Sequence, residues 1–372
     1  MSARRKKKFQ FLDPEATAFL SRYLDERSPS GDEQAGQQLW RERMSLYTGT
    51  GKEQVYGSVL AMLGPEKAFK VVLAAHADEV GWMVSQIRED GYIRVKGTAD
   101  TATALARAVV IHGTTGPVDA VMGWPAVHMR TEQIEPKAED LFLDCGCRTR
   151  KEVEEIGIHV GCTAVYRDSL VWENKQSIVA RALDNRLGGF ILTEVARALH
   201  AGNAELPFGL YFANAVQEEV GSNGARMLVE TLRPDLVLVT DVTHDITMPG
   251  VSKAKHGDIR AEDGPVLSYG PAVFGPLVQL IEEAARAEDI PFQRAAAMKS
   301  TGTDIDAFAY GDGGTCSALV SVPIKYMHTP VEWADRQTVV ETCRLLLASV
   351  YRLADQFDQL KTCWRNGTLG RG

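Results

Sequence analysis

The N-terminal part of the chain places apolar and polar side chains with the period of an α-helix. Apolar residues recur every three or four positions in 14–27 and in 32–47, and the turn-forming sequence SPSG (28–31) separates these segments. A nearly continuous apolar run, AFKVVLAAHADEVGWMV, follows at 68–84. Such runs are typical of strands buried on both faces of a parallel sheet. The pattern therefore predicts two helices followed by buried strand structure.

The pattern changes between residues 83 and 175, where short β-rich segments are punctuated by Gly, Pro and Asp. These segments lie at 92–97, 106–113, 116–123, 140–146 and 162–168. One helical segment, TRKEVEEIG at 149–157, interrupts them. A small β-rich domain is expected here.

From about residue 178 onward, strand and helix patterns alternate. Helices are expected at 182–202, 222–232, 274–290 and 334–357, and strands at 207–216, 234–242, 291–297 and 313–324. The simplest organisation is one α/β domain, residues 1–82 plus 176–372, interrupted by a β-rich insertion, residues 83–175. We find no internal repeat that would favour a solenoid.

Composition narrows the class of protein and its partners. The chain has 372 residues, of which 45% are hydrophobic and 24% charged, as is usual for a soluble globular protein. The net charge of -8 comes without a long basic stripe, so we do not expect a nucleic-acid partner. The sequence has no run of 18 apolar residues, so we expect no membrane-spanning helix. The basic segment 4–8 lacks an apolar stretch behind it, so we expect a solvated tail or an anionic-surface contact rather than a secretory signal.

Cysteine usage favours a reduced, cytoplasmic setting. The six cysteines are scattered without a CxxC pair, which argues against a disulfide framework. Cys145 and Cys147 could form a metal or redox pair. Their single intervening residue suits neither common pattern, so their role stays open.

Polar residues that end the apolar segments are the candidate chemistry. Ligands collect beyond the carboxyl ends of the strands in open α/β sheets. Each residue has an ordinary alternative: a strand-end histidine is often structural, Asp184 is well placed as a helix N-cap, and adjacent glutamates are usually solvated. Their joint occurrence favours a shared site, made by His76, Asp78, Asp184, Glu218, Glu219, Asp241 and His328.

Two histidines and three carboxylates are enough to hold two divalent ions, with one carboxylate between them. Imidazole and oxygen ligands suit zinc, cobalt or manganese. Such ions lie roughly 3.5–4 Å apart and clamp a hydrolytic water. Of the adjacent Glu218 and Glu219, one would ligate an ion and the other would take the proton of the water as general base. Asp78 would hydrogen-bond the ring nitrogen of His76 that faces away from the metal.

Motifs spread over almost the whole chain resemble one known family, the tetrahedral (TET) aminopeptidases, which include the glutamyl aminopeptidases of bacteria and archaea. This family belongs to the clan of co-catalytic di-zinc exopeptidases. The matching motifs are SPSGDE (28–33), AAHADEVG (74–81), ARALDNRLGG (180–189), VQEEVGSNGA (216–225), TDVTHDITMPG (240–250), GTD (302–304) and KYMHTPVE (325–332).

The resemblance implies a three-layer α/β/α domain with an inserted dimerisation domain, and a role for each site residue. It implies that Asp184 bridges two ions, with zinc most expected and cobalt or manganese as alternatives. The first ion would be held by His76, Asp184 and Asp241, and the second by Asp184, Glu219 and His328. Glu218 would be the general base and Asp78 would orient His76.

The resemblance also implies an activity and an assembly. The expected reaction is hydrolysis of the first peptide bond of short peptides, in dimers that build a dodecameric shell. A glycoside hydrolase that uses Glu218 and Glu219 is the alternative, although adjacent residues would struggle to flank a glycosidic bond. A catalytically silent binding protein is a third possibility, against which the full ligand set argues.

Several positions depart from the family pattern. His244 and His256 follow Asp241 where no ligand is expected, and we interpret both as loop residues. The segments 260–273 and 301–314 are also unusual and are expected to border the substrate pocket. The preferred N-terminal residue, the metal and the assembly beyond a dimer therefore stay open.

Overall fold

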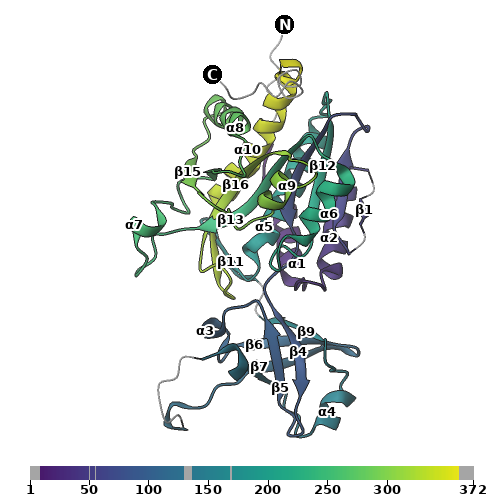
Figure 1. The fold of residues 1–372 in the computed structure, drawn as a ribbon, viewed down its shortest axis with the longest axis vertical. Coiled ribbons are helices and arrows are strands. Elements are labelled where there is room, and N and C mark those ends of the chain that lie inside the picture. The colour runs from purple at the N-terminus through teal and green to yellow at the C-terminus, as the bar shows by residue number, and fades with distance from the viewer. Residues whose placement is uncertain (1–8, 50, 55, 130–135, 168–169, 360–372) are drawn as a thin grey trace.

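The structure is a computed structural model that describes residues 9–49, 51–54, 56–129, 136–167 and 170–359. The basic segment 4–8 and Cys363 lie outside these residues. Figure 1 shows a body of sheet and helices with a smaller β-barrel at one end. The predicted architecture, an α/β domain with an inserted β-rich domain, is confirmed.

The larger sheet has a parallel centre and antiparallel edges. Its central strands run parallel to one another, in the order β12 (Gly209–Ala215), β3 (Lys70–His76), β13 (Leu236–His244) and β16 (Cys316–Lys325). The antiparallel strands are β1 (Lys52–Glu53) and β2 (Val59–Leu63) at one edge, and β17 (Glu332–Asp335), β11 (Ser177–Ala180) and β10 (Leu170–Glu173) at the other. β14 (Val266–Tyr269) also pairs with β16, and β15 (Gln293–Ala296) pairs with β14.

Helices cover both faces of this sheet because its central strands are apolar on both sides. In β3, Val71 and Leu73 belong to one apolar cluster, whereas Val72 and Ala74 belong to the opposite one. The first face packs against α1 (Pro14–Asp25), α2 (Gln34–Ser45), α5 (Leu183–Ala201), α8 (Gly275–Ala287) and α10 (Arg336–Asp355). The second face packs against α6 (Asn223–Leu232) and α9 (Ile305–Tyr310).

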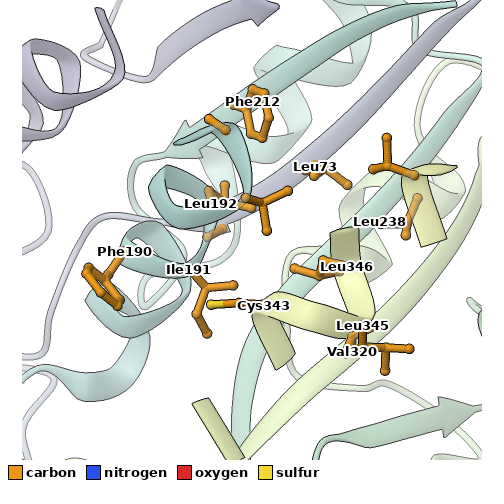
Figure 2. Close-up of a cluster of buried hydrophobic side chains, with 14 of the residues drawn as sticks. Leu73, Phe190, Ile191, Leu192, Phe212, Leu238, Val320, Cys343, Leu345 and Leu346 are labelled. Atoms are coloured by element: carbon orange, nitrogen blue, oxygen red, sulfur yellow. The ribbon is translucent and has the colours of Figure 1, made fainter. Parts of the chain in front are cut away.

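Figure 2 shows the main core, where Leu192 from α5 and Leu346 from α10 lie near Leu73 and Leu238 of the sheet. All four side chains are fully buried. This packing fixes α5, and with it the loop before the helix, against the central strands.

The barrel closes six antiparallel strands around a second apolar core. Its strands follow the order β4 (Trp82–Ile87), β5 (Ile93–Gly97), β8 (Phe142–Asp144), β7 (Gly116–Met122), β6 (Ala108–Gly113) and β9 (Thr163–Tyr166). Short helices α3 (Thr101–Ala104) and α4 (Arg150–Glu155) accompany them. Alternate residues such as Val109 and Ile111 of β6 point into the barrel core.

The structure refines two sequence predictions. The apolar run at 68–84 is divided between β3 and β4, which belong to different sheets. β10 falls within the predicted insertion 83–175, yet it pairs with β11 in the large sheet. The division into residues 1–82 plus 176–372 and residues 83–175 stays a prediction.

Several elements were not predicted, among them β2, β11 and β17, because strands of four or five residues carry little periodic signal. Among the described residues, none of the helices combines the length and apolar character needed to cross a bilayer.

Candidate metal centre

The predicted site residues converge on one rim of the large sheet, where its parallel strands end. His76 is the last residue of β3, and Asp241 lies near the end of β13. The remaining side chains come from the loops after β3, β12 and β16 and from the start of α5, and they are Asp78, Glu218, Glu219, His328 and Asp184. The structure therefore brings together all seven side chains that the sequence singled out.

The first candidate group is buried and joins three distant segments. His76 Nε2 lies 3.1 Å from Asp184 Oδ1 and 3.6 Å from Asp241 Oδ1. These three residues are at most 7% exposed. Their ligand atoms all lie within 4.8 Å of one another, close enough to coordinate one ion.

The second candidate group uses the other oxygen of Asp184. Asp184 Oδ2 lies 3.1 Å from His328 Nε2, which is 3.4 Å from Glu219 Oε2. Asp184 thus presents one oxygen to each histidine, as a bridging carboxylate requires. The alternative in which Asp184 caps the helix is wrong, because the neighbouring Asn185 accepts the backbone N–H of Gly188, at 3.0 Å, after the kink at these two residues.

Asp78 has a larger part than the predicted contact with His76. His76 Nδ1 lies 3.4 Å from Asp78 Oδ1 and 3.2 Å from the Asp78 backbone oxygen. The two Asp78 carboxylate oxygens also accept the backbone N–H groups of Glu218, at 2.9 Å, and of Glu219, at 3.1 Å. Ser30 donates its hydroxyl to the same carboxylate. Asp78 therefore orients a histidine and holds the loop that carries both glutamates.

The backbone around this loop explains why the contact is needed. β12 ends at Ala215, and Gln217 then adopts a left-handed conformation with φ 59°. A non-glycine residue rarely adopts this conformation without support. The carboxylate of Asp78 supplies that support directly after the turn.

The carboxylates of the rim raise the pKa values of both histidines. Hydrogen bonds with Asp184 and Glu219 raise the pKa of His328 to about 11. Burial lowers the pKa of His76, but the carboxylates of Asp241 and Asp184 outweigh it and hold that pKa well above its ordinary value. Both rings thus retain a proton where a neutral ring would be usual, so the rim strongly favours positive charge.

The pKa values of the two adjacent glutamates are raised as well. Burial, reinforced by Asp241, raises the pKa of Glu218 to about 9. Burial and the charge of Asp184 raise the pKa of Glu219 to about 7. One oxygen of Glu219 is buried without a hydrogen-bond partner among the described residues. The donor types, the excess of carboxylates and this unpartnered oxygen all fit divalent cations.

A buried ion pair fastens two ligand-bearing segments together beneath the rim. Glu79, three residues after His76, pairs with Arg181, three residues before Asp184. Glu79 also accepts the backbone N–H of Ser28. The pair keeps the end of β3 and the start of α5 in register. Glu79 and Arg181 lie in the motifs at 74–81 and 180–189, but their charges alone do not show that they pair with each other.

Two adjoining cavities open onto the centre. One of about 390 Å³ is lined by the candidate ligands together with His244, Thr301 and Met327. The other, of about 730 Å³, extends past Glu218 and Glu219 to Arg226, Glu230 and Tyr310. Gly302 and Thr303 belong to both linings. The two cavities together leave room for a ligand beside Glu218 and Glu219.

The linings also test the expectations about the unusual positions. His244 is the last residue of β13 and lines the smaller cavity, so its interpretation as a loop residue is wrong. His256 lies in the short helix α7 (Lys253–His256), so its interpretation as a loop residue is wrong too, and it belongs to neither of these linings. Residues from 301–314 line both cavities as expected, whereas 260–273 contribute to neither of these linings.

The family model of the M42 glutamyl aminopeptidases matches residues 57–345, which include every candidate ligand. The chain belongs to this family. It is a metal-dependent aminopeptidase, which makes it a peptide hydrolase. Membership favours peptide hydrolysis over the glycosidase alternative.

Individual relatives agree with this assignment. The lysyl aminopeptidase of Pyrococcus furiosus is 30% identical over 292 residues, which cover 76% of this chain and 82% of the relative. The TET aminopeptidase from the marine sediment archaeon Thaumarchaeota archaeon SCGC AB-539-E09 superposes with a TM-score of 0.86 at 26% identity, covering 91% of this chain and 96% of that one. The dodecamer PhTET1-12s gives a TM-score of 0.79 at 25% identity, with coverage of 89% and 97%.

Proposed function

We propose that this aminopeptidase removes the N-terminal residue of short peptides with two divalent ions held at the rim. His76, Asp184 and Asp241 hold one ion, and Asp184, Glu219 and His328 hold the other. The observation that carries this proposal is the position of Asp184, whose two oxygens each lie 3.1 Å from a different histidine.

When bound, the ions polarise the scissile carbonyl and increase the acidity of the attacking water. Glu218 then accepts a proton from that water and passes it to the departing amine, as a general base and acid. Its position at the edge of the cavity, 4.0 Å from His76 Nε2, suits this role. Asp78 keeps Glu218 in place through its backbone N–H.

Zinc is the metal that we propose first, with cobalt and manganese as alternatives. All three accept imidazole and carboxylate ligands, and their relative availability can outweigh differences in affinity.

We further propose that the subunit works as a homo-oligomer in the cytoplasm, with dimers as the unit of a dodecamer. The relative PhTET1-12s is a dodecamer. Large apolar side chains on or beside the barrel are exposed, including Val127 at 64% and Met129 at 78%. A second subunit that covers such side chains would remove apolar surface from water.

A panel of aminoacyl anilides, assayed after reconstitution with zinc, cobalt or manganese, tests the activity. We expect hydrolysis that a chelator abolishes and that re-added metal restores. A cellulose oligomer in the same assay is the control for the glycosidase alternative. Hydrolysis of the oligomer, or anilide hydrolysis that survives complete metal removal, would contradict the proposal.

A further inference from the structure

Besides Asp78, a second buried carboxylate contacts the backbone of the candidate ligands. Glu332 is the first residue of β17 and is only 1% exposed. The antiparallel pairing of β17 with β11 places Glu332 opposite Ala180. This register brings Glu332 next to the segment that leads into Asp184.

The two oxygens of Glu332 contact two different candidate ligand residues. Oε2 accepts the backbone N–H of Asp184 at 3.0 Å, and Oε1 accepts the backbone N–H of His328 at 2.6 Å. Asp184 and His328 are 144 residues apart in sequence, and their side chains meet at 3.1 Å. One carboxylate therefore ties together the backbones behind that contact.

Both of these backbones need such support. His328 has a left-handed conformation with φ 62°, and Asp184 has non-helical dihedral angles at the start of α5. The backbone N–H groups of both residues donate to the side chain of Glu332. An acceptor with two oxygens can satisfy both N–H groups at once, which a side chain with a single acceptor cannot.

We infer that Glu332 is a positioning residue, which sets the affinity for the ion shared by Asp184 and His328 by holding the backbones of these two residues. This inference rests on the proposed function, because it requires that ion. Groups that orient metal ligands typically change metal affinity by about 10- to 100-fold when they are removed. Asp78 would act in the same way on Glu218 and Glu219, so each pair of neighbouring site residues would have its own carboxylate.

Glu332→Gln in the full-length protein tests the inference, because the amide keeps the size of the side chain but leaves only one acceptor oxygen. Metal-free protein is titrated with Zn²⁺ by calorimetry, and the affinities of the two ions are compared with those of the wild type. We expect one ion to bind about 10- to 100-fold more weakly. Affinities equal to the wild type for both ions would overturn the inference.

Glu194→Gln is the matched control. Glu194 is also a fully buried carboxylate that accepts a distant backbone N–H, from Leu12 at 3.0 Å, but it lies in the second half of α5. It should lower the unfolding temperature of the metal-free protein without changing either Zn²⁺ affinity. If Glu194→Gln lowers a Zn²⁺ affinity as much as Glu332→Gln does, general destabilisation explains both effects and the inference fails.

Glu332→Asp keeps the test decisive if Glu332→Gln does not fold. The shorter side chain keeps the carboxyl group but loses reach, so one ion should again bind more weakly. Unchanged affinities in this variant would equally overturn the inference. If the wild type itself takes up no ions, the proposed function fails; if it takes up two and Glu332 variants do the same, only the role of Glu332 fails.

Discussion

The barrel and the rim of the large sheet bury different kinds of side chain. Among the described residues of the barrel, the buried side chains are apolar except for Thr163. The rim buries histidine and carboxylate groups, including His76, Asp78, Asp184 and Asp241. The apolar core of the barrel holds no charge to compensate, whereas the rim gathers carboxylates that bound cations would compensate.

This difference suggests that the barrel core contributes to folding stability, whereas the rim contributes to ion binding. Burying a charge without a partner lowers the stability of the folded state by roughly several kcal/mol, even after the surrounding structure relaxes. A ligand that binds only the folded state stabilises it by mass action. Divalent ions should therefore stabilise the rim, and changes in the barrel core should leave ion binding intact. The following predictions test this separation.

Asp184→Ala should have the largest effect, because it removes an oxygen from both candidate groups. We expect the purified variant to retain neither ion in full and to lose activity. Elemental analysis measures the metal content. Asp184→Asn, which keeps the shape without the charge, should show the same loss if charge is the cause. Two ions per subunit in either variant would exclude the bridging role.

Glu218→Gln should lower kcat by at least about 100-fold, the lower end of what general base catalysis contributes. Metal content should stay near that of the wild type, because Glu218 belongs to neither proposed ligand group. Steady-state kinetics together with elemental analysis separate these effects. A variant that keeps most of its activity would show that another group takes the proton.

Ile111→Ala should destabilise the barrel by about 2–5 kcal/mol, because it opens a cavity in a fully buried position. Urea unfolding measures this change, and calorimetry with Zn²⁺ should give unchanged affinities. Leu192→Ala is the matched truncation in the main core shown in Figure 2. If Ile111→Ala weakens ion binding, the barrel and the rim are energetically coupled and are not independent.

The affinity for the ions should also depend on pH. The raised pKa of Glu219, about 7, means that this carboxyl keeps its proton below pH 7 and must release it when an ion binds. His328, with a pKa of about 11, must also release a proton. Affinity should thus rise with pH between 6 and 8, by about tenfold per unit for each proton released. Calorimetry across this range is the measurement, and a flat affinity would exclude proton competition.

The helices and the central strands could be predicted because their apolar patterns are long. Burial on both faces of β3 follows from the run at 68–84, and α5 and α10 follow from their helical periodicity. The split of that run between β3 and β4 could not be predicted, since an apolar strand in a sheet and one in a barrel have the same local pattern. The short edge strands were missed for lack of pattern.

In the candidate site, too, some features could be predicted from the sequence and others could not. Side-chain chemistry at strand ends predicted which groups converge, including His76 and His328, although their roles as ligands remain a proposal. The backbone contacts of Asp78 and Glu332 were not predictable, because an acidic residue carries no mark of the N–H groups that it will accept. His244 likewise reached the cavity only because β13 continues past Asp241.

By itself, the sequence determined the order of helices and strands and the kind of chemistry available at their ends, because periodicity and residue type are local properties. Only the tertiary structure decided that Asp184 faces two histidines and that Asp78 and Glu332 each hold two backbones. These arrangements depend on strand register and on the packing of α5 against the sheet, which bring together residues more than 100 positions apart.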